Sequence, residues 1–305
     1  MSEKLYAPAY YERFSCIADK CRHSCCVNWE IDVDDRAVEK YASSPHSYAA
    51  TVLSSIDEGE EGRHFALLPD GRCPHLDERG LCNVILHMGQ EHLCHICREH
   101  PRFYHQTEKG REVGLGMCCE EACRLILSSD DFHSFVEVGQ NVRETDSVPL
   151  PLTREKVYRI LSAPTLSYRQ KRQRIEEDFA IPHDLFEDGT LIASLEELEY
   201  LEKDHRALLV GYDGHTEVEE RWHSYLDRAL AYFLFRHVTE EENEAETKVS
   251  IALSLFLERL VASMIATARP ADFEGVVDLA RILSEEVEYS EDNLAALRFE
   301  LFSIL

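Results

Sequence analysis

The chain has 305 residues, with 32 Lys and Arg against 58 Asp and Glu, and a formal net charge of −26 at pH 7. This length suggests about two domains. A strongly acidic surface repels phosphate backbones and anionic lipid, so neither nucleic acid nor a membrane is expected as the main partner. No basic segment followed by an apolar run opens the chain, so we expect no secretory signal or membrane anchor and a cytoplasmic location.

The cysteines are the most informative residues. All eleven lie between Cys16 and Cys123. A reducing cytosol disfavours disulfides, and an odd number cannot pair completely, so the pattern indicates metal ligation or thiol chemistry. The four blocks are Cys16-x4-Cys21-x3-Cys25-Cys26, Cys73-x8-Cys82, Cys94-x2-Cys97 and Cys118-Cys119-x3-Cys123.

The first part of the chain, to about residue 124, is irregular and has few segments long enough for an independent apolar core. Bound metal is therefore expected to help hold it together. Acidic residues at its start predict a short helix from Asp34 to Tyr41. A strand is predicted at Phe65–Leu68, followed by a turn at residues 69–71, and a second turn at residues 78–80. Cys73 and Cys82 would then lie on neighbouring arms of a small hairpin.

Beyond Cys123 the apolar pattern becomes helical. Apolar residues recur at helix spacing in residues 191–201 and 218–234. Val249–Ala268 is apolar for nearly its whole length, but Glu258 and Arg259 would each cost about 2.5–3.5 kcal/mol inside a bilayer. We therefore predict a core helix there. Ser290 is expected to begin a last amphipathic helix that runs to the C-terminus.

Pro149 and Pro151 mark the predicted domain border, and Thr239–Glu246 an acidic linker. The predicted fold is mainly α, with an irregular cysteine-rich metal-binding N-terminal module that contains a small hairpin, followed by a C-terminal helical bundle. The predicted domains are a cysteine-cluster metal-binding module at 1–148 and a helical domain at 149–305.

Spacing alone leaves two metals open. Structural zinc takes four Cys or His ligands, which typically come from two CxxC-like pairs. This sequence has one CxxC pair, Cys94 and Cys97. So many soft thiols also suit an iron–sulfur cluster, which takes four cysteines. The CxxxCxxC triplet of radical S-adenosylmethionine enzymes is absent. His75 and His95 are possible alternative ligands, although most histidines of the region are expected to be ordinary exposed ones.

Residues 154–174 carry seven Lys and Arg and one acid in an otherwise acidic chain. They are either a docking patch for an acidic protein substrate or a solvated helix face, and the second is the default interpretation. Five residues flank the first cysteine block and either line a pocket or, as the preferred interpretation, simply pack over the metal module: Tyr6, Tyr10, Tyr11, Trp29 and Glu30.

Four blocks, FSCIADKCRHSCCVNWEIDVD, DGRCPHLDERGLCNV, EHLCHICREHPR and CCEEACRLIL, resemble the flagellin lysine N-methylase family in this order. A shorter version resembles the wider group of zinc- or iron-chelating cysteine-cluster proteins. The resemblance implies methyl transfer to the ε-amines of flagellin lysines, with S-adenosylmethionine as donor and a [4Fe–4S] cluster. Carried over by position, the metal-binding cysteines are Cys16, Cys21, Cys25, Cys26, Cys73, Cys82, Cys94, Cys97 and Cys119. Cys118 and Cys123 are additions.

Methyl transfer to lysine requires a deprotonated amine. A lysine ammonium, with a pKa of about 10.4, has no lone pair until a carboxylate, a tyrosinate or desolvation removes its proton. No GxGxG loop is present, so a Rossmann-type donor site is not predicted. The expected function is a protein-lysine N-methyltransferase acting on flagellin. The alternative is a non-catalytic iron–sulfur or zinc-binding redox sensor or scaffold. The sequence assigns no catalytic residue and no oligomeric state.

Overall fold

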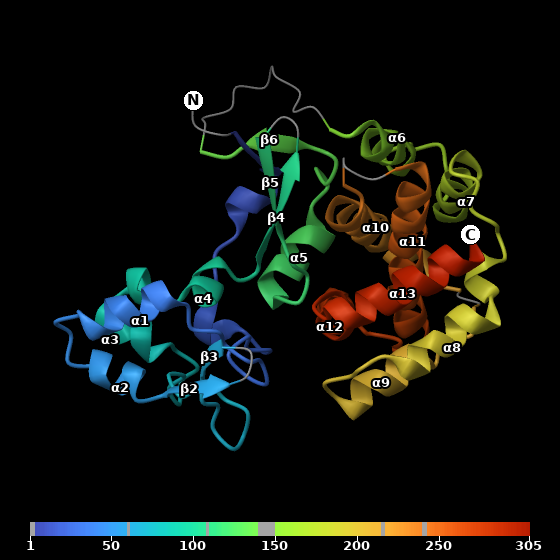
Figure 1. Ribbon diagram of the computed structural model, residues 1–305. Coiled ribbons are helices and arrows are strands. Elements are labelled where there is room, and N and C mark those ends of the chain that lie inside the picture. The colour runs from blue at the N-terminus through green and yellow to red at the C-terminus, as the bar shows by residue number, and fades with distance from the viewer. Residues whose placement is uncertain (1–3, 60–61, 108–109, 140–149, 215–216, 240–242) are drawn as a thin grey trace. The chain divides into compact units, whose positions relative to one another are not determined.

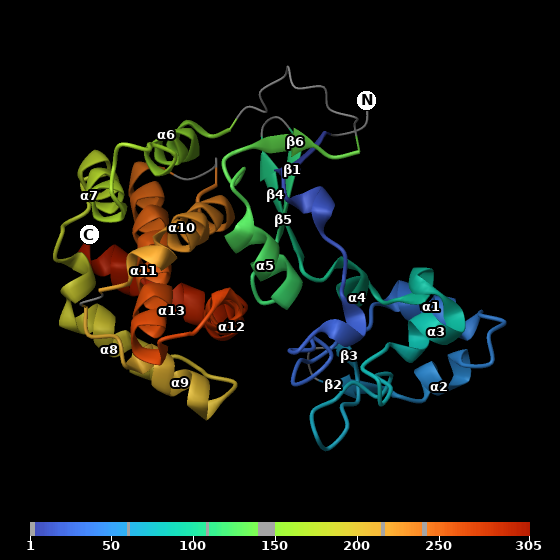
Figure 2. The ribbon, with the colours of Figure 1, turned by 180° about the vertical axis from the view of Figure 1, so that it is seen from behind.

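The computed structural model describes residues 4–59, 62–107, 110–139, 150–214, 217–239 and 243–305. These residues are mainly helical (Figures 1 and 2). They form two compact units, one of Ser15–Phe103 and one of Met1–Phe14 with Tyr104–Leu305. We call them the cysteine unit and the helical unit. This division differs from the border expected between residues 148 and 149, because strands before and after the cysteine unit belong to one sheet.

The helical unit begins with that sheet. β1 (Leu5–Pro8) runs parallel to β5 (Gly110–Leu115) and antiparallel to β6 (Phe135–Glu137), and β4 (Arg102–Thr107) follows β5 at the edge, in the order β4-β5-β1-β6. Leu5 lies opposite Arg111, and Ala7 opposite Val136. Ala7, Val113 and Leu115 are fully buried, and Tyr6 and Glu112, which alternate with them along the strands, are buried as well, so both faces of the sheet are covered at these positions.

Helices make up the rest of this unit. They are α5 (Glu120–Ser128), α6 (Leu152–Leu161), α7 (Tyr168–Asp178), α8 (Gly189–Glu197), α9 (Lys203–Val210), α10 (His223–His237), α11 (Glu244–Ala268), α12 (Phe273–Leu283) and α13 (Glu291–Ile304). Short turns of helix are η1 (Tyr11–Arg13), η4 (Leu185–Glu187), η5 (Glu220–Trp222) and the π-helix η6 (Ser284–Glu288). The C-terminal helical bundle is confirmed, with α10 and α11 packed at its centre.

α11 contains the predicted core helix. By length and composition it could cross a membrane, but 89% of its most apolar window is buried inside the structure. Asn243 and Glu246 close a capping box at its start, so the C-terminal part of the predicted acidic linker is helical, while residues 240–242 lie outside the described residues. Ser290 caps α13 as predicted, because its side chain accepts from the Asn293 amide at 3.1 Å.

Two other helix predictions need correction. The apolar pattern of residues 191–201 is not one helix, because α8 ends at Glu197 and Leu198 is extended although it is buried. In residues 218–234, regular α-helix starts only at His223. Pro149 lies outside the described residues, whereas Pro151 directly precedes α6.

The cysteine unit consists of short elements. They are η2 (Ala18–Lys20), α1 (Asp35–Ala42), α2 (Ala49–Leu53), β2 (Ile56–Gly59), β3 (Gly62–Phe65), α3 (Asn83–Met88), η3 (Gln90–His92) and α4 (His95–Glu99). The helix predicted from Asp34 is confirmed as α1, with the Asp34 side chain as its N-cap. The small hairpin is present, but β2 and β3 form it, so the strand predicted at Phe65–Leu68 ends where it was expected to begin.

One testable consequence concerns His105 on β4. Its ring meets the Phe235 ring edge-on at 6.0 Å, and burial lowers the pKa of His105 from 6.5 to about 4. Since the folded pKa lies below the unfolded one, this contribution to stability is present above pH 6.5 and is lost as the pH falls toward 4. In the wild type, the free energy of unfolding should decrease as the pH falls from 6.5 toward 4. In His105→Phe we expect this decrease to be smaller by on the order of 1–2 kcal/mol. Urea unfolding across this pH range measures it.

The matched control is His133→Phe, which replaces an exposed histidine of the same unit. It should leave the pH dependence of unfolding as in the wild type. Identical pH profiles for the wild type and His105→Phe would show that the partly buried imidazole does not cause this loss of stability at low pH.

Candidate metal centre

Five cysteines lie together in the core of the cysteine unit: Cys26, Cys73, Cys82, Cys94 and Cys97. Cys73 and Cys94 are buried, and the other three are partly buried against the same core. The Cys97 thiol is close enough to hydrogen-bond with Cys94. Negative charge on Cys26 or Cys73 also raises the pKa of Cys97. Apolar side chains such as Val84 and Met88 surround the group. Cysteines up to 71 positions apart are thus gathered in one place.

Backbone pairing places Cys26 beside Cys73. The Cys73 amide donates to the Cys26 carbonyl at 2.8 Å, and the Asn28 amide donates to the Gly71 carbonyl at 2.9 Å. Gly71 has a φ of +78°, and a Cβ there would lie 2.0 Å from the Asn28 side-chain oxygen. Glycine is therefore required at the turn that precedes Cys73.

The loop from Cys73 to Cys82 folds back on itself. Leu76 and Cys82 form an isolated antiparallel bridge, and the Gly80 amide donates to the Asp77 carbonyl at 3.0 Å. The predicted turn before Cys82 is therefore present, although the loop is separate from the β2–β3 hairpin. Cys82 directly precedes α3.

Asp34 ties the CxxC segment to α1. One carboxylate oxygen caps α1 by accepting from the Ala37 amide at 3.0 Å, and the other accepts from the His95 amide at 2.7 Å. His95 begins α4, directly after Cys94. One acidic side chain thus orients α1 and the start of α4 at once. The sequence predicted an acidic start of the helix here, but neither the capping bond nor the contact with a residue 61 positions away.

Backbone amides point at several of the sulfurs. The His75 amide donates to the Cys73 sulfur, the Val84 and Ile85 amides to that of Cys82, and the Cys97 amide to that of Cys94. Such bonds favour thiolate and are one means by which proteins tune thiolate-bound metals.

The hydrogen bonds lower the pKa of these thiols, whereas burial raises it. Burial raises the pKa of Cys73 to about 12 and also raises the pKa of Cys82. By contrast, a hydrogen bond from the Cys25 thiol lowers the pKa of Cys26 to about 7, and one from Cys97 lowers the pKa of Cys94. The group therefore holds both thiols that ionise readily and thiols that would ionise only against a positive charge such as a metal ion.

The other four cysteines of the predicted set lie outside this core group. Cys16 and Cys25 are exposed, and Cys21 is partly exposed, with its thiol donating to the His23 carbonyl at 3.0 Å. Cys119 belongs to the helical unit, where it precedes α5. The structure therefore brings together five of the nine predicted cysteines.

The fit of a metal can be judged from the donors. Across the described ranges, no three or more His, Cys, Asp or Glu side chains are arranged as ligands around one point. The five thiols are a packed group and not a formed coordination sphere. Their number and softness nevertheless match what either a four-cysteine iron–sulfur cluster or a zinc ion takes.

The two cysteines judged to be additions are buried in the helical unit. Cys123 is fully buried, and its thiol donates to the Val277 carbonyl at 3.5 Å. Burial raises the pKa of both Cys118 and Cys123. Inert thiols of this kind behave as small apolar side chains.

The two histidines offered as alternative ligands differ in burial. His95 is exposed, and its Nδ1 lies 3.1 Å from an Arg98 nitrogen. His75 is 1% exposed. Its Nδ1 lies 3.1 Å from the Tyr48 hydroxyl, and its Nε2 lies 2.8 Å from the Ser55 hydroxyl. Tyr48 and Ser55 had no signal in the sequence, because only the fold brings them to residue 75.

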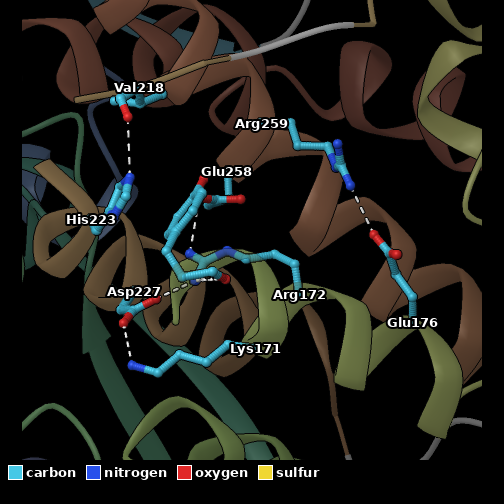
Figure 3. A network of polar contacts seen from close by, with 9 residues as sticks. Lys171, Arg172, Glu176, Val218, His223, Asp227, Glu258 and Arg259 are labelled. Carbon is cyan, nitrogen blue, oxygen red and sulfur yellow. Dashed lines mark hydrogen bonds and ion pairs between the residues drawn. The ribbon is translucent and has the colours of Figure 1, made fainter. Parts of the chain in front are cut away.

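The basic segment 154–174 is not a free positive patch. Each of its seven cations is paired with an acid of the helical unit: Arg154 with Glu112, Lys156 and Arg174 with Asp178, Arg159 with Glu155, Arg169 with Glu217, Lys171 with Asp227, and Arg172 with Asp227 and Glu258. Figure 3 shows Lys171 directed at Asp227, and Arg172 directed at Asp227 and Glu258. These ion pairs argue against a docking patch for an acidic substrate. The alternative, a solvated helix face, is also wrong for Arg154 and Arg172, because both are buried.

The tyrosines expected near the first cysteine block pack within the helical unit. Tyr6 and Tyr10 are both buried. Tyr10 lines a crevice together with Phe135, Tyr158 and Phe235, but the crevice is too narrow to admit a water molecule. It offers no room for a methyl donor, so the pocket interpretation fails for Tyr10. Both tyrosines are packing residues, but of the helical unit and not of the metal module as predicted. Tyr11 and Trp29 are partly buried, and Glu30 is exposed.

Comparison with known proteins agrees with the cysteine blocks. The chain is 32% identical over 130 residues to the flagellar biosynthetic protein FliU of Salmonella muenchen, which is 41% of this chain and 77% of that protein. It is 29% identical over 167 residues to a lysine-N-methylase of Salmonella typhimurium. The chain belongs to the flagellin lysine N-methylase family.

The family resemblance seen in the four blocks is thereby confirmed. The match to the Salmonella typhimurium protein covers 53% of this chain and 42% of that lysine-N-methylase, and a second lysine-N-methylase, from Salmonella choleraesuis, is 28% identical over the same shares. The chain thus spans less than half the length of the lysine-N-methylases that it matches. No family model matches the chain. No solved structure matches it either.

Proposed function

We propose that this protein is a protein-lysine N-methyltransferase that acts on flagellin, with S-adenosylmethionine as methyl donor and a metal centre held by the cysteine unit. The observation that carries the proposal is the similarity to proteins named lysine-N-methylase and FliU. The gathering of thiols in the cysteine unit supports its metal-binding part. Thiols must stay reduced to bind metal, so the proposed location is the cytoplasm.

Four of the five grouped cysteines are the proposed ligands of a [4Fe–4S] cluster, with zinc as the alternative metal. Bound there, an iron–sulfur cluster supplies a redox centre whose potential depends on hydrogen bonds to its sulfurs. The amides of His75, Val84 and Ile85 are placed to make such bonds. Cys16, Cys21 and Cys119 stay proposed ligands through the family resemblance alone, whereas Cys25 also contacts Cys26 through its thiol.

The reaction moves a methyl group from the donor sulfonium to a lysine nitrogen. The sulfonium carbon–sulfur bond breaks, a carbon–nitrogen bond forms, and the lysine ammonium must first lose a proton to an acceptor. The products are methyl-lysine and S-adenosylhomocysteine.

A direct assay tests the enzyme. Protein purified without oxygen, given S-adenosylmethionine and flagellin from its own organism, should add methyl groups to lysine-containing flagellin peptides. Mass spectrometry of the peptides detects them, and omission of the donor is the control. Metal-loaded protein that adds no methyl group and binds no donor by calorimetry would instead favour the redox sensor or scaffold.

The metal is tested separately by iron, sulfide and zinc analysis of the same preparation. A four-cysteine cluster should give brown protein that contains equal amounts of iron and sulfide. Colourless protein with about one zinc and no iron would replace the cluster by zinc.

A further inference from the structure

His75 lies near the start of the Cys73–Cys82 loop and is almost completely buried. Its ring meets the Phe65 ring edge-on at 4.8 Å and the Tyr48 ring at 5.7 Å. Its main chain contacts both cysteine segments, because its amide donates to the Cys73 sulfur and its carbonyl accepts from the Asn83 amide at 2.7 Å. Asn83 directly follows Cys82.

The hydrogen bonds around the ring fix its tautomer. The Ser55 hydroxyl donates its one proton to the Val52 carbonyl at 2.7 Å, so its oxygen must accept from His75 Nε2, 2.8 Å away. Nε2 therefore carries the proton. Nδ1 is then the acceptor, and the Tyr48 hydroxyl donates to it at 3.1 Å.

The hydrogen-bond network continues to Tyr48. The Tyr48 hydroxyl has one proton, and unprotonated Nδ1 is the acceptor that lies 3.1 Å away. Both ring nitrogens of His75 are thus engaged, one as donor and one as acceptor. Neither has a lone pair to offer a metal ion, because a ligating imidazole needs a free one.

We infer that His75 is a positioning residue of the metal centre, which holds Cys73 and Cys82 in register through Tyr48, Ser55 and Asn83 and does not itself bind the metal. The inference rests on the metal-binding part of the proposed function but not on methyl transfer. Side chains that support metal ligands in this way typically contribute about 10–100-fold to metal affinity.

Cobalt(II) is a suitable probe, because it occupies tetrahedral thiolate sites and its visible bands report the set of ligands. We would titrate the full chain, reduced and free of other metals, and measure affinity by competition with a chelator. His75→Phe removes both side-chain bonds and keeps an aromatic ring, whereas His75→Asn keeps an acceptor for Tyr48. Tyr48→Phe removes only the donor. His46→Phe changes an exposed histidine of the same unit and is the control.

We expect His75→Phe and Tyr48→Phe to bind cobalt about 10–100-fold more weakly. At saturation their visible spectra should match the wild type, His75→Asn should recover part of the affinity, and His46→Phe should bind normally. If His75→Phe does not fold, Tyr48→Phe and His75→Asn carry the same test.

Two results would overturn the inference. A changed spectrum at saturation in His75→Phe would make His75 a ligand, and unchanged affinity in both His75→Phe and Tyr48→Phe would remove its positioning role. Wild-type protein that binds no cobalt would overturn the metal centre and this inference with it. Cobalt-binding protein whose native form does not methylate flagellin would contradict only the enzyme proposal.

Discussion

Cys73→Ala is expected to lose its metal. Cys73 is buried among the grouped thiols. Loss of a side chain that supports a metal ligand typically weakens metal binding by about 10–100-fold, and loss of the ligand itself should weaken it at least as much. Because metal binding is coupled to folding, the cysteine unit should also melt at a lower temperature. Metal content after purification without oxygen and thermal unfolding followed by circular dichroism measure the two effects.

Cys123→Ala is the matched control, since Cys123 is also buried but lies in the helical unit. It should keep its full metal content, although the lost sulfur will lower the stability of the helical unit somewhat. Equal metal loss in the two variants would mean that the grouped thiols of the cysteine unit are not the ligands.

Arg172→Met should destabilise the helical unit by about 3–5 kcal/mol, because it leaves a buried carboxylate without its cation. Glu258 is fully buried in the middle of α11, and one of its oxygens accepts from Arg172 at 3.0 Å and from the Tyr168 hydroxyl at 2.6 Å. Arg172 also pairs with Asp227 on α10 (Figure 3). Chemical denaturation at neutral pH measures the change in the free energy of unfolding.

Arg169→Met is the control on the same helix. Its ion pair with Glu217 is exposed, so the loss should stay below about 1 kcal/mol. The double variant Arg172→Met/Glu258→Met should recover much of the stability, because buried ion pairs can often be replaced by apolar side chains of similar size. If Arg172→Met behaves like Arg169→Met, the buried network does not hold α7 to the bundle.

The basic segment stabilises the helical unit through its ion pairs. In the sequence, Lys171 and Arg172 look like surface charges on a helix, because the acids that neutralise them lie more than 50 positions away. In the structure, α7 uses them to attach to α10 and α11. Reversal of these charges would therefore test stability and not substrate capture.

The sequence by itself determined the local features. The helix near Asp34, the Ser290 cap, the core position of α11 and the turn before Cys82 all depend on residues close in the chain, and all were predicted. The cysteine blocks were enough to identify the family.

Only the tertiary structure decided how distant segments combine. Parallel pairing of β1 with β5 joins residues about 100 positions apart, and it assigns the N-terminus to the helical unit. Likewise, five cysteines gather in one core while Cys119 belongs to the other unit, and His75 meets Tyr48 and Ser55. Periodicity and spacing report which face of a segment is apolar, but not which distant segment covers it, since that choice depends on packing and hydrogen bonds between parts of the chain far apart in sequence.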